Sequence, residues 1–167
     1  MKIRLRVLLA SIVFLLCLIS HASAQVANAG SSNILISFKS HGEPCFELCV
    51  GEEDLGCCPA YSFTISGDGE VNYEGLIGVK VRGKKAHSIS VRQVEELVAE
   101  FDKIKFFSLS SQYNDHRIDH YNGVTISLTV GERTKSIYVG HGQPEALDIL
   151  LRKVVEVSGV KQYLGRS

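Results

Sequence analysis

Four of the five cysteines lie within 14 residues, at Cys45, Cys49, Cys57 and Cys58. Four thiols allow three disulfide pairings, and a bridge between the adjacent Cys57 and Cys58 is disfavoured because it would strain the peptide that joins them. Thiolates also bind zinc or act in redox catalysis. Zinc sites usually carry two well separated cysteine pairs, however, and redox sites a Cys-x-x-Cys motif. We therefore prefer structural disulfides, with a metal or thiol site on this loop as the alternative.

A second cluster consists of two aspartates and two histidines, at Asp115, His116, Asp119 and His120. The two imidazoles are four residues apart and would share one face of a helix, where they and the carboxylates could bind a transition metal. Neighbouring asparagines and Gly123 favour a polar loop instead. A metal site here is an alternative to a simple exposed loop, and either histidine could serve as the base of a hydrolase.

Three basic residues, Lys80, Arg82 and Lys84, alternate along a segment that we predict to be a strand. Alternate strand residues point to the same face of a sheet. The three could bind an anionic glycan, a lipid head group or a protein, although a solvent-exposed sheet face explains them equally well.

Local signatures of catalysis are missing from the sequence. It contains no Gly-x-Ser-x-Gly, no His-Glu-x-x-His and no phosphate-binding loop. We therefore predict no catalytic residue and no cofactor, and we rank a hydrolase third among the functional hypotheses.

Residues 1–24 have the pattern of a secretory signal peptide. Three basic residues precede an uncharged apolar run over 7–19, and Ala22-Ser23-Ala24 forms an A-x-A cleavage site. Cleavage would leave 15 basic and 18 acidic side chains, which excludes a strongly basic nucleic-acid-binding protein. The apolar run is too short to span a bilayer as a helix. We expect a periplasmic or secreted protein with no membrane span in the mature chain.

The elements that must position these residues follow from hydrophobic periodicity. Apolar residues alternate with polar ones over 34–39, 61–66, 71–73, 79–82, 124–130 and 136–139, which is typical of half-buried strands. Gly67-Asp68-Gly69 and Gly131-Glu132 suit tight hairpin turns. We expect Gly75 to end a strand.

Two segments have helical periodicity. Ser90 and Gln93 can form a capping box before an apolar stripe that runs to Ile104, and a second stripe follows Pro144 and ends before Gly159. We predict an α+β fold, with an antiparallel sheet of five to six strands and two α-helices on one face. The predicted organisation is a signal peptide (1–24), a flexible lead-in (25–32) and one domain (33–167) with a cysteine-bearing loop at 41–59.

Several motifs resemble the bacterial family called domain of unknown function 6438. They are Cys58-Pro59-Ala60-Tyr61 with the following Gly67-Asp68-Gly69, then Val71 and Tyr73-Glu74-Gly75, Ile89-Ser90 with Val94-Glu95-Glu96-Leu97-Val98, and Phe106-Phe107-Ser108-Leu109. The resemblance covers most of the chain from residue 34 to about 157. It implies an exported α+β module and no particular activity.

This chain departs from the family pattern at its cysteines. The family usually has one close pair, Cys-Phe-Gly-x-Cys-Pro, whereas here Cys45-Phe46 and Cys58-Pro59 are separated by a longer acidic insert that contains Cys49 and Cys57. Nested bridges, Cys45–Cys58 and Cys49–Cys57, fit that arrangement best. Our leading hypothesis is a non-catalytic binding or structural module whose partner is a protein or another component of the cell envelope.

Overall fold

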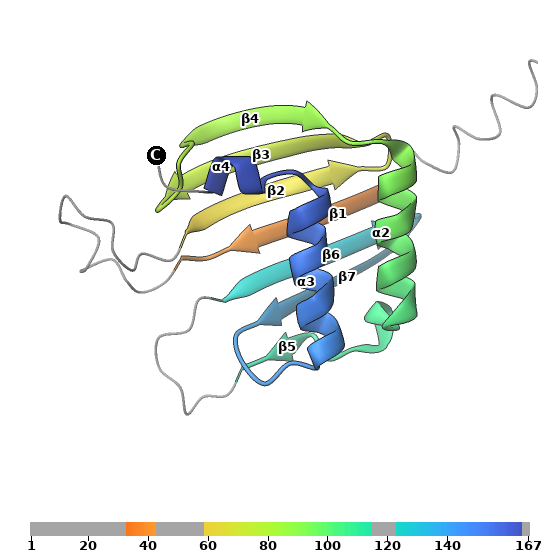
Figure 1. The fold of residues 1–167 in the computed structure, drawn as a ribbon. Coiled ribbons are helices and arrows are strands. Elements are labelled where there is room, and N and C mark those ends of the chain that lie inside the picture. Colours follow the sequence, from red (N-terminus) through yellow and green to blue (C-terminus); the bar gives the residue numbers. More distant parts are fainter. Residues whose placement is uncertain (1–32, 43–58, 115–122, 165–167) are drawn as a thin grey trace, which may run out of the picture. The chain divides into compact units, whose positions relative to one another are not determined.

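The structure is a computed structural model that describes residues 33–42, 59–114 and 123–164. Seven strands form one sheet in the order β4-β3-β2-β1-β6-β7-β5 (Figure 1). They are β1 (Ile34–Ser40), β2 (Ala60–Ser66), β3 (Glu70–Ile77), β4 (Gly83–Ser88), β5 (Gln112–Tyr113), β6 (Val124–Val130) and β7 (Arg133–Val139). All paired strands are antiparallel except β5 and β7, which are parallel.

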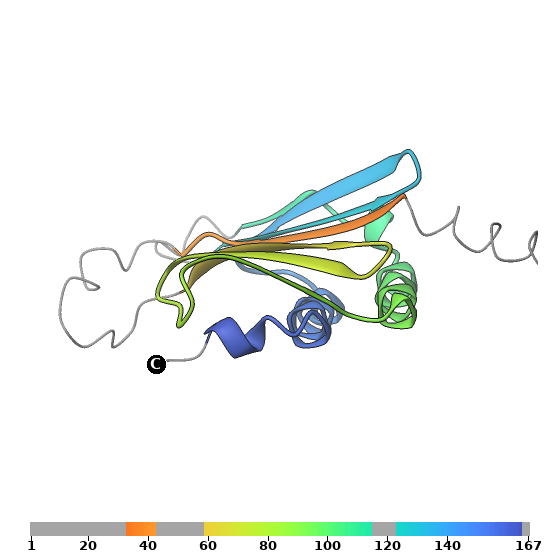
Figure 2. The ribbon, with the colours of Figure 1, turned by 90° about the horizontal axis from the view of Figure 1, so that it is seen from above.

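The helices lie on one side of this sheet (Figure 2). They are α2 (Val91–Lys103), α3 (Glu145–Val157) and the short α4 (Lys161–Leu164), and a 3-10 turn, η2 (Phe106–Ser108), follows α2. In the described residues the opposite face of the sheet carries no helix. The fold is therefore α+β in two layers, as the strand and helix patterns predict.

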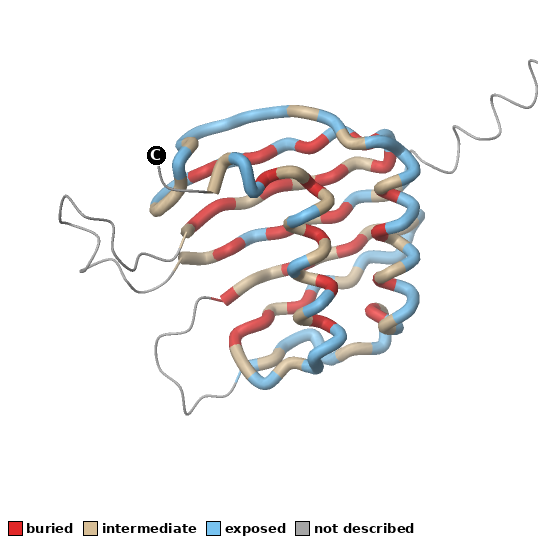
Figure 3. Tube along the Cα trace, in the orientation of Figure 1, coloured by how far each residue is buried: buried red, intermediate tan, exposed pale blue. Residues whose placement is uncertain are grey.

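Alternation along the strands decides which residues form the core. The register places Tyr73, Phe63, Phe38, Ile126 and Ile137 side by side across five strands, and all five are buried under the helices. Buried and less buried residues alternate along the central strands, whereas the edge strand β4 is almost wholly exposed (Figure 3). The alternation of apolar and polar residues therefore determines which face of the sheet packs against the helices.

The predicted turns and caps are confirmed. Gly69 and Gly131 have positive φ angles of 92° and 61° in the two hairpin turns, a conformation that glycine adopts without steric cost. The Ser90 hydroxyl accepts from the Gln93 amide, and the Gln93 side chain accepts from the Ser90 amide, which completes the capping box of α2. These local signals place the ends of the elements correctly.

Two local predictions are wrong, and the predicted strand count is only roughly right. The sheet has seven strands where about five to six were expected, and the short β5 was not among those expected. Residues 79–82 form the turn between β3 and β4 rather than a strand, so Lys80 and Arg82 do not alternate with Lys84 on one strand. Gly75 lies inside β3 and does not end it.

Close packing explains the glycine at position 75. A Cβ there would collide with the carbonyl oxygen of Val81 and the hydroxyl of Tyr73. The Tyr73 hydroxyl donates to that same carbonyl over 3.1 Å. The turn thus folds back over β3, and glycine is required by the approach of the turn's backbone rather than by a strand end.

Candidate functional site

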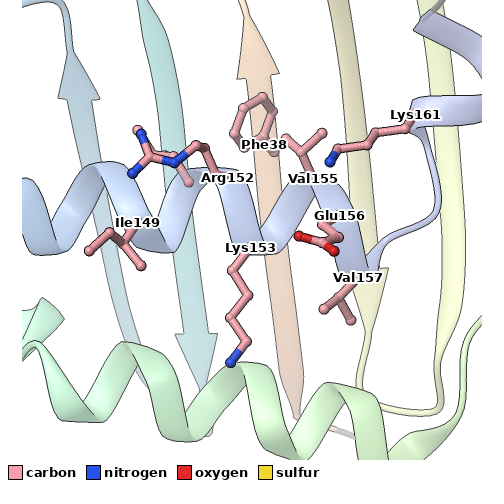
Figure 4. Close-up of a pocket in the computed structure, with 9 residues that line it drawn as sticks. Phe38, Ile149, Arg152, Lys153, Val155, Glu156, Val157 and Lys161 are labelled. Carbon is pink, nitrogen blue, oxygen red and sulfur yellow. The ribbon is translucent and has the colours of Figure 1, made fainter.

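A groove with a volume of about 800 Å³ follows α3 on the helix-covered side of the sheet. This volume lies within the range of roughly 300–1,000 Å³ that is usual for small-molecule sites. Five of the nine lining residues are apolar. The lining consists of Phe38, Ile149, Leu151, Arg152, Lys153, Val155, Glu156, Val157 and Lys161 (Figure 4).

α3 forms the groove because it carries more apolar surface than the core uses. Leu147, Leu150 and Val154 are its buried residues. At 3.6 residues per turn Leu151 and Val155 point to one flank of that stripe and stay half-buried, and Ile149 is 51% exposed. Leu151 and Val155 pack against the core and keep part of their surface exposed, so that a ligand could cover the remaining apolar surface.

The ring of Phe38, on β1, contributes to the groove from the sheet. It is only 3% exposed, and its centroid lies 5.0 Å from that of Phe63 and 5.8 Å from that of Tyr61, in stacked arrangements. Stacked rings inside a close-packed core have little freedom to move. This part of the lining is therefore formed in advance.

The charged side chains that border the apolar lining lie on different sides of α3. Arg152 and Lys161 lie on the same side of α3 as Phe38, whereas Lys153 points toward α2 (Figure 4). The Lys153 ammonium is 2.8 Å from a Glu100 carboxylate oxygen. That hydrogen bond, helped by the charge of Lys103, lowers the pKa of Glu100. Arg152 and Lys161 take part in none of the ion pairs formed between described residues.

α4 is anchored, which places Lys161 beside the groove. The Val81 amide donates to the Tyr163 carbonyl over 3.1 Å, and the ring of Tyr163 lies 4.9 Å from that of Tyr73. The Tyr163 hydroxyl is 3.3 Å from His87 Nδ1, and His87 Nε2 donates to the Ser158 carbonyl over 2.7 Å. The edge strand β4, the turn before it and the end of α3 thus hold α4 in place.

A comparison of the sequence with known protein families gives a match that covers most of the described strands and helices. A family model described as a domain of unknown function, DUF6438, matches residues 53–158. The chain belongs to the DUF6438 family. No curated protein matches it. The DUF6438 match includes α3, whereas Phe38 and Lys161 lie outside it.

The residues that the sequence singled out are placed in part. Cys45, Cys49, Cys57 and Cys58, and likewise Asp115, His116, Asp119 and His120, lie outside the described residues. Lys80, Arg82 and Lys84 are all exposed. The first two flank Val81 in the turn that contacts α4, and Lys84 lies on β4. Lys80 and Arg82 therefore lie near α4, whereas none of the three basic residues lines the groove.

Sequence reasoning did not find Phe38, Arg152 or Lys161. Phe38 and α3 are more than 100 residues apart in the chain, so no local motif joins them. The available signal was the composition of α3, in which Ile149 and Val155 are apolar although the buried residues of the helix are Leu147, Leu150 and Val154. That excess width marks a helix with a second apolar surface.

A histidine also meets hydroxyl groups on the face of the DUF6438 sheet opposite the helices. His41 Nε2 is 2.8 Å from Thr125 Oγ1, and the His41 ring lies 5.9 Å from the ring of Tyr138.

Among described residues no group of three or more His, Cys, Asp or Glu side chains could hold a metal ion. None of the described helices is long and apolar enough to cross a membrane.

One serine has a spacing known from serine hydrolases but not their geometry. Ser158 and Lys161 form a Ser-x-x-Lys pattern, contrary to the expectation that the chain contains none. Ser158 is 0% exposed, and its hydroxyl donates to the Val155 carbonyl and accepts from the Val160 amide. Those bonds satisfy backbone groups at the end of α3, so Ser158 stabilises the helix end and is not placed as a nucleophile.

Proposed function

We propose that this DUF6438 protein is an exported, non-catalytic module that binds a small apolar ligand in the groove beside α3. The observation that carries the proposal is the groove itself, which combines a stacked aromatic residue, Phe38, with apolar side chains of α3 that the core leaves half-buried or exposed. Exposed apolar surface beside a preformed cavity is the usual basis of small-molecule binding.

The sequence supports the remaining parts of the proposal. The signal-peptide pattern over 1–24 supports export, and four cysteines in the loop at 41–59 support a disulfide-stapled segment in an oxidising compartment. A bridge that closes a loop of this length stabilises the folded state by about 3 kcal/mol in the chain-entropy model. Such a staple would hold the segment that joins β1 to β2.

Binding is tested with Nile red, an uncharged probe that fluoresces in apolar surroundings. We expect saturable fluorescence with the wild-type protein and a loss of at least tenfold in affinity for Val155→Asp, because a carboxylate would replace an apolar side chain that lines the groove. Leu35→Asp is the matched control, since Leu35 is an exposed apolar residue, 41% accessible, on the opposite sheet face.

Circular dichroism of each variant checks that the fold is retained. Equal binding by Val155→Asp and wild type, or no saturable signal at all, would contradict the proposed site.

Export and disulfides are tested on full-length protein expressed in a bacterial host and purified from the periplasm without reductant. The expected results are a mature chain that begins at Gln25, no free thiols and a Cys45–Cys58 link in non-reducing peptide mass spectrometry. Free thiols with stoichiometric bound metal would reject the staple and favour a metal site instead.

A further inference from the structure

Two cations without an ion-pair partner among the described residues lie beside the apolar part of the groove. Arg152, on α3, and Lys161, on α4, are exposed and lie on the same side of α3 as Phe38 and Val155 (Figure 4). The other lining cation, Lys153, is paired with Glu100. Glu156 is the single acidic residue of the lining, so the unpaired lining charges are two positive and one negative.

We infer that the ligand is a free single-chain amphiphile with an anionic head group. Its apolar chain would cover the partly exposed Leu151 and Val155, next to the nearly buried ring of Phe38, and its head group would be attracted by Arg152 and Lys161. This inference rests on the proposed function, because it specifies the ligand of the same groove. Charge complementarity is the argument: Arg152 and Lys161 lie on either side of Phe38 and Val155 (Figure 4), so an anionic head group gains electrostatic energy near either cation, whereas a cationic head group would be repelled.

The geometry also explains why head group and chain would bind together. Lys161 is carried by α4, in which the Tyr163 carbonyl accepts from the Val81 amide and the Tyr163 hydroxyl contacts His87 of β4. His87 in turn donates to the Ser158 carbonyl at the end of α3. A preorganised cation costs less to bring to a ligand than one on a free tail. Long basic side chains also lay their methylene stems along apolar surfaces while the charge stays in water, and the same arrangement suits an amphiphile.

The test compares ligands that differ only in the head group: dodecanoate, dodecanol and dodecyltrimethylammonium, each below its micelle concentration, measured by calorimetry with the full mature protein. We expect dodecanoate to bind about tenfold more tightly than dodecanol, which corresponds to two surface charge interactions of ordinary strength. The cationic ligand should bind most weakly. Added salt should weaken dodecanoate binding and leave dodecanol binding unchanged, because salt screens exposed charges.

Variants that remove a positive charge identify the residues that attract the anionic head group. Arg152→Gln and Lys161→Gln should each weaken dodecanoate binding by about threefold, and the double variant by about tenfold, without changing dodecanol binding. Lys39→Gln is the matched control: it removes the same charge from an exposed residue on the opposite face of the sheet. Exposed substitutions of this kind leave the fold intact, which thermal unfolding checks.

The outcomes separate the inference from the proposed function. Equal affinities for dodecanoate and dodecanol overturn the inference, while the groove still binds an apolar ligand. If dodecanoate, dodecanol and Nile red all fail to bind, both the inference and the proposed function are overturned. Binding to anionic vesicles without binding of free dodecanoate also overturns the inference, because the ligand would then be a membrane surface.

Discussion

The two faces of the sheet use neighbouring residues of the same strands in opposite ways. On the helix-covered face, Tyr73, Phe63, Phe38, Ile126 and Ile137 form a buried row across five strands. At the adjacent position of each strand, the open face carries the row Asn72, Thr64, Ser37, Ser127 and Ser136. No residue of this second row is buried.

Several polar groups of the open face bond to one another, without contact to any of the described helices. The hydroxyls of this face bond to one another across β6 and β7, Ser127 to Ser136 over 2.9 Å and Thr129 to Thr134 over 3.0 Å. The covered face instead depends on close packing against α2 and α3, and the groove lies where apolar side chains of α3 at the margin of that packing stay partly exposed. Stability should thus be concentrated on the covered face, and the ligand-binding site that we propose lies at the margin of that face.

The largest expected contrast between the faces comes from adjacent residues of β2. Phe63→Ala should lower the free energy of unfolding by about 3–5 kcal/mol, because it removes a ring that is 1% exposed and leaves a cavity. Thr64→Ala, on the open face, should change it by no more than about 0.5 kcal/mol. Urea unfolding of the two variants measures both values, and similar losses would mean that the open face is covered in solution.

A smaller effect on the free energy of unfolding is expected at alkaline pH from Tyr61, which belongs to the covered face. Burial, with a smaller contribution from the nearby Tyr73, raises the pKa of Tyr61 to about 12 from its ordinary value of 10.0. Below pH 10 the hydroxyl is protonated in both the folded and the unfolded chain. Between pH 10 and pH 12 only the unfolded chain loses the proton, so the free energy of unfolding should fall by roughly 2–3 kcal/mol.

Tyr61→Phe should remove most of that alkaline loss. The remainder should come from Tyr73, whose pKa is also raised by burial. Tyr138→Phe, on the open face, serves as the control and should leave the loss in place. Urea unfolding at pH 9 and pH 11 gives the comparison; an alkaline loss that is the same in Tyr61→Phe and in wild type would show that another group is responsible.

The smallest expected effect tests the hydroxyl pairs of the open face. Ser127→Ala and Ser136→Ala should each change the free energy of unfolding only slightly, and a double-mutant cycle should give a coupling of about 0.2–1 kcal/mol. A coupling well above this range would indicate that the pair is shielded from water, contrary to the exposure of Ser136.

Local patterns predicted most of the fold. Alternation located five of the seven strands, and the glycine turns and the Ser90–Gln93 box located two hairpins and the start of α2. The errors arose where distant backbone decides the local structure. From the sequence Gly75 is expected to end a strand, whereas in the structure the turn at 79–82 folds over it. The two-residue β5 exists because it pairs with the edge of β7.

The candidate site was much less predictable than the fold. The cysteine and histidine clusters are visible in the sequence, and their roles stay predictions because they lie outside the described residues. The groove was not visible, since it joins Phe38 of β1 to Arg152 of α3 and Lys161 of α4. No spacing rule connects residues so far apart in the chain.

The sequence by itself determined the class of fold, the faces of the strands and membership of the DUF6438 family. These depend on residue types at short, regular separations, and period-two and helical patterns report burial directly. Tertiary structure alone decided the order of the strands, the close approach over Gly75 and the groove beside α3. Each of these results from contacts between segments that are distant in the chain, and their positions depend on how the packed layers fit together.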